Sequence, residues 1–306
     1  MNSKWFVIVN PTSGNGISKK LWPKIEKELI TQKFNFEVAF TKHKEHSKEL
    51  VKNALNKNIK KIISVGGDGS LHNIVNGILK STIKDFKSVK LGVIPIGTGN
   101  DWVRNYNIPI NYKQAITIIK EEFTYLQDIG KITLLNSNNN YYFHNMAGIG
   151  FDGHVVNKVH KYKYLGYLAY LTGALISIIG FKRRYLHIEF NKTIISGKSL
   201  MLLIGIGKFS GGGMQLTENV ITNDGLFDIS YIKNISIFTV IKHISKLFKG
   251  TVTKLPIIKT YKTSEIEISI KNSEDIYMQA DGELIETCNF KATILPKALQ
   301  FIIPKH

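Results

Sequence analysis

Cysteine is almost absent from the sequence, which has one, Cys288, among 306 residues. A single cysteine excludes a disulfide framework and a cysteine-based zinc cluster, and it is typical of a reducing cytosol. The first residues also lack the charged segment, long apolar stretch and cleavage site of a secretory signal, so we expect no export. The length predicts two domains of roughly 100–200 residues each, and hydrophobic residues, at 43%, suffice for two packed cores.

Acidic residues are also scarce relative to basic ones. Lys and Arg number 41 and Asp and Glu 23, so the net charge is +18. This excess favours an anionic partner such as nucleic acid, a bilayer surface or a phosphorylated ligand. An AT-rich genome explains the same excess without any function, because its codons favour Lys, Asn and Ile. The sequence has no helix-turn-helix, RNP-like aromatic pattern or zinc-finger spacing, so we expect no nucleic-acid partner, whereas a membrane surface stays open.

Short apolar runs alternate with longer amphipathic segments from residue 4 to about 123. This alternation predicts an α/β lobe, a mostly parallel sheet with helices on both faces. We expect strands over Trp5–Asn10, Phe36–Thr41, Lys61–Val65 and Leu91–Pro95, and helices over Ser18–Gln32, His46–Asn56 and Leu71–Lys80. Ligands of such sheets bind at the carboxyl ends of the strands.

After about residue 124 the strand-like runs alternate apolar and polar residues, which predicts an antiparallel sheet or sandwich. We expect strands over Tyr185–Asn191, Ser199–Gly205, Leu226–Ile232, Glu265–Ile270 and Ile276–Gln279, a polar turn over Asn136–Asn140, and helices over Tyr164–Phe181 and Ile237–Phe248. The predicted domains are therefore an α/β lobe over residues 1–123 and a β-rich sandwich lobe over residues 124–306, with the last strand free to return to the first lobe.

The segment Tyr164–Phe181 has no charged residue over about the shortest length that spans a bilayer. Basic residues flank it on both sides, which the positive-inside rule does not favour for a span. Gly166, Gly173 and Gly180 recur every seven residues and give the helix one small face for close packing. We expect a buried or lipid-facing helix of the second lobe, with a transmembrane span as the alternative.

Three glycine-bearing turns follow predicted strands of the first lobe, so all three lie at one edge of the sheet. The first, Asn10–Gly14, is neither a Walker A loop nor the Rossmann fingerprint. The second, Gly66–Ser70, has three glycines around Asp68, which leaves space for phosphate oxygens. The third is Gly97–Asp101. Together they predict a site for nucleotide phosphates.

The carboxylates of these turns have two chemical roles open to them. Asp68 cannot ligate a phosphate directly, since like charges repel, so it either holds Mg²⁺ through water or accepts the proton of an attacking hydroxyl. Asp101 is available for Mg²⁺ or for orienting a lysine. Ser70 can cap the following helix and donate to phosphate.

The motifs Asn10-Pro-x-Ser-Gly14, Gly66-Gly-Asp-Gly-Ser70 and Pro95-x-Gly-Thr-x-Asn-Asp101 resemble those of the bacterial diacylglycerol kinase-like lipid kinases, relatives of sphingosine and ceramide kinases. The resemblance covers nearly the whole chain, since it continues through Gln127–Lys131, Asn145–Asp152, Asn223–Asp228 and Ala280–Glu283. It implies a lipid kinase with an NAD kinase/diacylglycerol kinase-like first lobe, which uses Mg²⁺ and ATP to phosphorylate a lipid hydroxyl. Diacylglycerol is the default substrate and phosphatidic acid the product.

The resemblance also assigns residues. The family's ATP contacts fall on Asn10, Pro11, Thr12, Ser13, Gly14, Thr41, Gly66, Gly67, Asp68, Gly69, Ser70, Leu71, His72, Asn73, Gly97 and Thr98. Its catalytic positions fall on Glu283, Asp68 and Asp101. Glu283 matches the usual proton acceptor and Asp68 competes for that role; we favour Asp68 and Asp101 as the residues that organise Mg²⁺.

A structural Mg²⁺ site of some family members matches a turn in the second lobe. Its ligands here would be the Asp224 carboxylate and the carbonyls of Thr222 and Leu226. An ordinary Asn-Asp-Gly hairpin turn explains the same residues.

The sequence departs from the family pattern in two places. Ser70 stands where the family usually has Thr, which keeps the hydroxyl. His72-Asn73 stands where many members have Asn-Glu, so a role resting on that glutamate does not transfer.

Two other functions stay open: an NAD kinase, which shares the Gly-Gly-Asp-Gly turn, and a non-catalytic basic protein that binds nucleotide at a membrane. Lys242, His243, Lys246 and Lys249 lie close together in the region of the predicted helix Ile237–Phe248, where they either face the bilayer or form a solvated face. Basic residues near an anionic bilayer contribute about 1 kcal/mol each, so we expect a cytoplasmic protein peripherally associated with the inner face of the membrane. The sequence leaves the oligomeric state open, with a homodimer among the alternatives.

Overall fold

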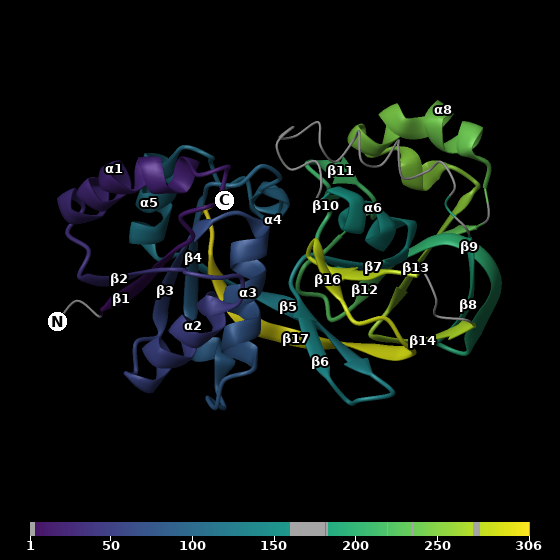
Figure 1. Ribbon diagram of the computed structural model, residues 1–306, viewed down its shortest axis with the longest axis horizontal. Coiled ribbons are helices and arrows are strands. Elements are labelled where there is room, and N and C mark those ends of the chain that lie inside the picture. The colour runs from purple at the N-terminus through teal and green to yellow at the C-terminus, as the bar shows by residue number, and fades with distance from the viewer. Residues whose placement is uncertain are drawn as a thin grey trace. The chain divides into compact units, whose positions relative to one another are not determined.

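The computed structural model describes residues 4–159, 181, 183–218, 220–233, 235–271 and 276–305 (Figure 1). It divides into two compact units. Unit 1 comprises Met1–Gln127 and Lys297–His306, and unit 2 comprises Asp128–Pro296. The chain therefore leaves unit 1, forms unit 2 and returns to unit 1.

Unit 1 is built on a parallel sheet in the order β17-β4-β3-β1-β2. Its strands are β1 (Trp5–Val9), β2 (Phe36–Phe40), β3 (Lys61–Gly66), β4 (Lys90–Pro95) and the end of β17 (Phe290–Ile302). The buried residues of β1, β3 and β4 form continuous apolar runs, as expected for strands covered on both faces. The last strand reaches β4 through the pair Phe301 and Leu91.

Helices cover both faces of this sheet. They are α1 (Ile17–Thr31), α2 (His46–Asn56), α3 (Asp68–Leu79), α4 (Asp101–Asn105), α5 (Tyr112–Glu121) and the short 3-10 helix η1 (Phe86–Ser88). Figure 1 shows α1 and α5 on one face and α2 and α3 on the other. Trp22, Ile25 and Leu29 follow helical spacing and are buried in one cluster with Val7 and Val9 of β1.

Unit 2 is an antiparallel structure around β9 (Thr193–Gly205). The first half of β9 pairs with β8 (Arg184–Phe190). Its second half pairs with β7 (Met146–Gly150) on one side and with β12 (Phe227–Lys233) on the other. The remaining strands are β5 (Thr124–Leu134), which begins in unit 1, β6 (Asn140–Phe143), β10 (Phe209–Ser210), β11 (Met214–Gln215), β13 (Ile258–Thr263), β14 (Glu265–Lys271), β15 (Met278–Ala280), β16 (Glu283–Ile285) and the first part of β17. Its helices are α6 (Phe151–Val159), α8 (Ile237–Phe248) and η3 (Val252–Lys254). Inward-facing residues such as Leu202, Ile204 and Phe227 form its core.

The predicted fold class is confirmed: a mostly parallel α/β lobe is followed by a β-rich one. The polar turn after β5 and the helix Ile237–Phe248 also occur where expected. Residues 164–180 of the predicted helix Tyr164–Phe181 lie outside the described residues. Among the residues that are described, no helix combines the length and apolar character needed to span a membrane.

Several boundaries differ from the expectation: β9 begins at Thr193 and not at Ser199, for example, and one difference bears on the site. Helix α3 begins at Asp68 and not at Leu71, because Gly67 is extended and its carbonyl accepts hydrogen bonds from the N–H groups of Ser70 and Leu71. Asp68, Gly69 and Ser70 therefore form the first turn of the helix. The weak helix propensity of glycine hides this start in the sequence.

Candidate active site

The three glycine turns and Thr41 follow four neighbouring parallel strands of unit 1. Hydrogen bonds join these strand ends directly: the N–H of Thr41 donates to the Val9 carbonyl at 2.9 Å, that of Asn10 to Val65 at 3.0 Å, and that of Ile96 to Gly66 at 2.8 Å. The sequence-predicted nucleotide residues of unit 1 thus share the carboxyl edge of one sheet, where α/β sheets bind their ligands.

The first turn is bonded to the second through side chains. Asn10 Nδ2 donates to Ser70 Oγ at 2.9 Å, and Ser13 Oγ lies 3.4 Å from the same oxygen. Asn10 Oδ1 accepts from the backbone N–H and the hydroxyl of Thr12, at 3.1 and 2.9 Å. Asn10 therefore fixes both its own turn and the first turn of α3.

The second turn touches the third through glycine backbone. A Cβ added at Gly97 would lie 2.5 Å from the Cα of Gly67, closer than real side chains approach. Asn100, in the left-handed conformation with φ of 50°, closes the third turn by donating to the Gly97 carbonyl at 2.8 Å. Only glycine at positions 67 and 97 lets the two turns meet.

Asp68 links α3 to α4. Its two carboxylate oxygens accept hydrogen bonds from the backbone N–H groups of Asp101 and Trp102, both at 3.1 Å. These are N–H groups of the first turn of α4, which have no partner inside the helix. Asp68 therefore has a structural role that the sequence did not reveal, in addition to any role with a metal ion.

The carboxylates of Asp68 and Asp101 converge beside Gly99. A Cβ added at Gly99 would lie 3.1 Å from Asp68 Oδ2 and 3.3 Å from Asp101 Oδ2. Two carboxylate oxygens around a position without a side chain match the hard oxygen donors that Mg²⁺ takes. The residues present at this edge therefore fit the cation that the family implies.

The predicted nucleotide residues Leu71, His72 and Asn73 have buried side chains. His72 Nε2 lies 3.3 Å from Asn76 Nδ2, and Asn73 Nδ2 donates to the Lys44 carbonyl at 3.2 Å. Asn73 thus ties α3 to the segment between β2 and α2. Nucleotide contact by these three residues stays a prediction.

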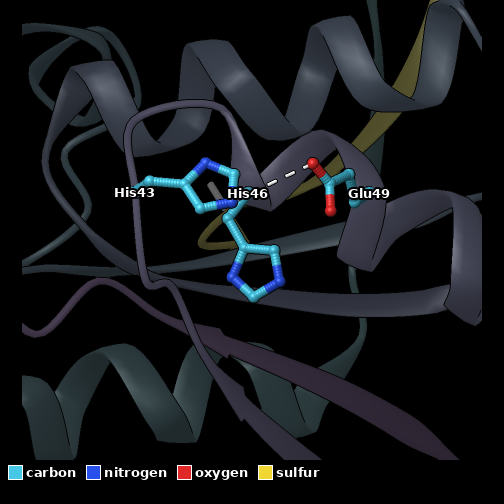
Figure 2. Close-up of side chains that lie close together, drawn as sticks. All are labelled: His43, His46 and Glu49. Carbon is cyan, nitrogen blue, oxygen red and sulfur yellow. Dashed lines mark ion pairs between the residues drawn. The ribbon is translucent and has the colours of Figure 1, made fainter.

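His43, His46 and Glu49 form a cluster after Thr41, at the start of α2 (Figure 2). One ligand atom of each lies within 4.8 Å of the others, the two imidazoles stack at 4.9 Å, and His43 Nε2 lies 4.0 Å from Glu49 Oε1. His46 Nδ1, however, accepts the backbone N–H of Lys42 at 3.1 Å, so in the neutral ring Nε2 carries the proton. A metal ion at His46 Nε2 would require the other tautomer. The hydrogen bond from Lys42 to His46 instead stabilises the turn between β2 and α2.

Glu283, the predicted proton acceptor, is the first residue of β16, and the turn that presents it is bonded tightly within unit 2. The Asp281 carboxylate accepts the backbone N–H groups of His144, Asn145 and Met146 at 3.1, 2.9 and 3.1 Å. His144 Nδ1 lies 2.8 Å from Asp281 Oδ2, and both side chains are buried. The turn that carries Glu283 is thereby fixed to the start of β7.

A second set of bonds closes the same turn. The Gln279 side chain accepts the N–H of Gly282 at 2.7 Å and donates to Asp152 at 2.5 Å. Asp152 is a buried residue of α6. Asp152, the last residue of the motif Asn145–Asp152, therefore supports the Glu283 turn through Gln279.

The predicted metal loop of unit 2 is held by backbone hydrogen bonds and one ion pair. Asp128 Oδ2 accepts the N–H of Gly225 at 2.7 Å, and the Thr222 carbonyl accepts the N–H of Asp128 at 2.8 Å. Asp224 Oδ1 accepts the N–H of Leu226 at 3.0 Å, and its Oδ2 accepts from Lys262 Nζ at 3.0 Å.

Asp228 lies beside this loop, with Lys262 Nζ 3.6 Å from its Oδ1. Burial raises the pKa of Asp228 to about 6, against the opposing effect of Lys262. The pKa of Lys262 is raised as well: burial lowers it, but the hydrogen bond to Asp224 and the charge of Asp228 raise it more. Burial therefore outweighs the ion pair in its effect on the pKa of Asp228, whereas the ion pairs together outweigh burial in their effect on the pKa of Lys262.

The comparisons with known proteins agree with this geometry. The diacylglycerol kinase catalytic domain model matches residues 4–132, and the YegS C-terminal NAD kinase beta sandwich-like domain model matches residues 145–303. The chain is 30% identical to a diacylglycerol kinase of Staphylococcus aureus (strain JH9) over 288 residues, covering 92% of this chain and 87% of the relative. It is 28% identical to "Putative lipid kinase YtlR" of Bacillus subtilis (strain 168), covering 97% and 99%.

Among solved structures, the fold is similar to that of a protein described as a putative diacylglycerol kinase from Bacillus anthracis str. Sterne, with a TM-score of 0.79, 24% identity and coverage of 99% of this chain and 97% of that one. The fold and the sequence matches together define the class of protein, a kinase. The chain belongs to the diacylglycerol kinase-like lipid kinase family.

Three residues of these sites were missed by sequence reasoning. Asp281 lies inside a motif that was recognised, next to Gly282 and Glu283, but its own role was not assigned. His144 directly precedes the recognised motif at Asn145 and gave no other signal. Lys262 has no sequence signal, because its position opposite Asp228 depends on strand register.

Proposed function

We propose that this kinase transfers the γ-phosphate of ATP to the free hydroxyl of diacylglycerol and releases phosphatidic acid and ADP. The observation that carries the proposal is the joining of three glycine turns, with Asp68 and Asp101, at one edge of a parallel sheet in a chain of this family. Relatives with the printed name diacylglycerol kinase support the choice of lipid acceptor.

The turns of unit 1 bind and orient the nucleotide. Backbone N–H groups of the first turn of α3, with the positive end of the helix dipole, attract phosphate oxygens. Glycine at positions 67 and 97 brings the second and third turns together at this edge. Asp68 and Asp101 would hold Mg²⁺, which when bound neutralises the charge on the phosphates.

Unit 2 supplies the base. The acceptor hydroxyl attacks the γ-phosphorus, the bond to the β-phosphate oxygen breaks, and the Glu283 carboxylate takes the hydroxyl proton. The Asp281 turn holds Glu283 in place for this transfer. Alignment and charge neutralisation then account for most of the acceleration, as is general for phosphoryl transfer.

The test is an assay of the purified chain with labelled ATP, Mg²⁺ and diacylglycerol in mixed micelles. We expect labelled phosphatidic acid, and a loss of at least about 100-fold in Glu283→Gln, since general bases contribute about 10²–10⁴-fold. Glu286→Gln is the matched control, because Glu286 is an exposed carboxylate just after the same turn. A lipid product no greater than that of Asp68→Ala, across several lipid alcohols, would refute the proposal.

NAD is tested as acceptor in the same assay. Phosphorylation of NAD without any lipid product would assign the chain to a soluble dinucleotide substrate. If neither acceptor is phosphorylated and Glu283→Gln leaves every measured property of the protein unchanged, the non-catalytic nucleotide-binding function is supported.

We also propose that the protein works from the cytoplasm at the anionic inner face of the membrane. The net charge of +18 supports this, as do Lys242 and Lys246 within α8 and Lys249 directly after it. Replacing these three lysines by Gln should weaken binding to anionic vesicles about 100-fold at low salt, at about 1 kcal/mol per lysine. The control replaces Lys19, Lys20 and Lys24 of α1; an equal effect of both triple variants would contradict a specific role of α8.

Light scattering decides between a monomer and the homodimer.

A further inference from the structure

Lys262 holds a position in unit 2 where a cation is required. It lies on β13 directly opposite Asp228 on β12, as the Cα partner in the antiparallel register. From there its Nζ reaches Asp224 Oδ2 at 3.0 Å and Asp228 Oδ1 at 3.6 Å. One ammonium therefore joins the Asn223–Leu226 turn to the strand that follows it.

Asp228 is shielded from water, whereas Asp224 lies at the solvent-exposed rim. The Asp224 side chain is 20% exposed and that of Asp228 is 7% exposed. A buried carboxylate with a second carboxylate beside it is unfavourable unless a positive charge lies between them. The cation could be a divalent metal ion or a protonated amine.

Two of the three expected ligands already have protein partners. Asp224 uses one oxygen for the N–H of Leu226 and the other for Lys262, and the Thr222 carbonyl accepts the N–H of Asp128. Backbone hydrogen bonds do not by themselves exclude Mg²⁺, since Asp68 also accepts two. The difference here is the ammonium of Lys262, which a divalent cation would have to displace to reach Asp224.

We propose that the ε-ammonium of Lys262 is the resident cation of the Asn223–Leu226 turn, in the place where the family resemblance would put a structural Mg²⁺. The turn is then stable without a divalent ion. This inference is independent of the proposed activity, because it concerns the stability of unit 2 and not the acceptor.

Thermal melting of the full chain without nucleotide tests the inference. The wild type, Asp224→Asn, Lys262→Met and Lys259→Met are compared in EDTA and in millimolar MgCl₂ or CaCl₂. Lys259 is the matched control, since it is an exposed lysine on the same strand. We expect Lys262→Met to lower Tm in EDTA by roughly 3 °C or more, since the buried Asp228 loses its compensating charge, and the partial exposure of Lys262 limits the loss. Lys259→Met should change Tm by less than about 2 °C.

The metal dependence separates the two cations. Any rise in Tm that Mg²⁺ or Ca²⁺ causes in the wild type should be equally large in Asp224→Asn, because ions bound elsewhere do not depend on this turn. A rise that Asp224→Asn abolishes would overturn the proposal, and so would a Lys262→Met variant as stable as the Lys259→Met control. If Lys262→Met does not fold, Lys262→Arg, which keeps the charge, should melt within about 2 °C of the wild type.

Discussion

Replacing Asp281 by Ala should destabilise unit 2 more than any single loss of a surface charge. The carboxylate accepts three backbone N–H groups at 2.9–3.1 Å and lies 2.8 Å from His144 Nδ1. Ala would leave these buried donors without the acceptor they now share. Each unsatisfied buried group costs about 1–3 kcal/mol, so we expect a loss of at least about 3 kcal/mol in the free energy of unfolding, out of the roughly 5–15 kcal/mol that a folded protein has.

A graded variant makes the prediction sharper. Asp281→Asn keeps one acceptor oxygen but turns an amide toward His144, where two donors would face each other. The Asn145 and Met146 N–H groups share Oδ1, and the His144 groups share Oδ2. We therefore expect Asn to lose about half of what Ala loses, which is roughly 1.5 kcal/mol or more.

Urea denaturation followed by two probes measures the effect. The three tryptophans, Trp5, Trp22 and Trp102, all belong to unit 1, so their fluorescence reports that unit, whereas far-UV circular dichroism includes the strands of unit 2. A loss below about 1 kcal/mol for Asp281→Ala, or equal losses for Ala and Asn, would refute the view that this carboxylate fixes the Glu283 turn through three backbone donors beside the His144 ring.

Three further predictions concern unit 1. Asp68→Asn should lower the free energy of unfolding by about 0.5–2 kcal/mol, as loss of a helix cap does, yet reduce phosphoryl transfer by about 100-fold or more. If activity falls only in proportion to the folded fraction, Asp68 has a structural role alone. Gly97→Ala, whose Cβ would meet Gly67 at 2.5 Å, should lower kcat/KM for ATP by about 100-fold with a native circular dichroism spectrum, and unchanged kinetics would contradict the contact between the turns. Glu122 bonds Lys61 at 2.5 Å and Lys90 at 3.0 Å; burial raises its pKa, but the two lysines lower it more. The stabilisation is therefore present above pH 4.5 and lost as pH falls through the lowered pKa. Glu122→Gln should be less stable than the wild type at pH 7, by at most about 1 kcal/mol because solvent screens the pairs, and the difference should shrink steadily as pH falls below 4.5. A difference in stability that does not shrink in acid would refute the ion pairs as its cause.

The parts of the fold that follow from local rules were predictable. Apolar runs alternating with amphipathic segments gave the parallel sheet, and a glycine turn after each of three strands gave the shared edge. Local composition alone missed the start of α3, because Gly67 and Gly69 weaken the helical pattern around Asp68.

Contacts between residues far apart in sequence were not predictable in the same way. Asp281 meets the His144–Met146 segment, and Lys262 meets Asp228, only because strands pair in one register. A shift of one residue would turn each side chain to the other face of its strand. The roles of these residues therefore depend on tertiary structure, whereas the motifs at Asn10, Gly66 and Gly97 carry their signal in consecutive residues.

The return of β17 to unit 1 has a consequence for synthesis of the chain on the ribosome. Residues 1–127 emerge first, but the strand that pairs with β4 includes Phe301, which is synthesised after all of unit 2. Until then the nascent unit 1 exposes the hydrogen-bonding edge of β4, and an open edge invites pairing with other chains. Residues 299, 301 and 302 are fully or almost fully buried, so the first unit also lacks part of its core until then. Folding of unit 1 is thus completed last although its synthesis begins first, and a chain interrupted before residue 299 should be a target for chaperones and proteases.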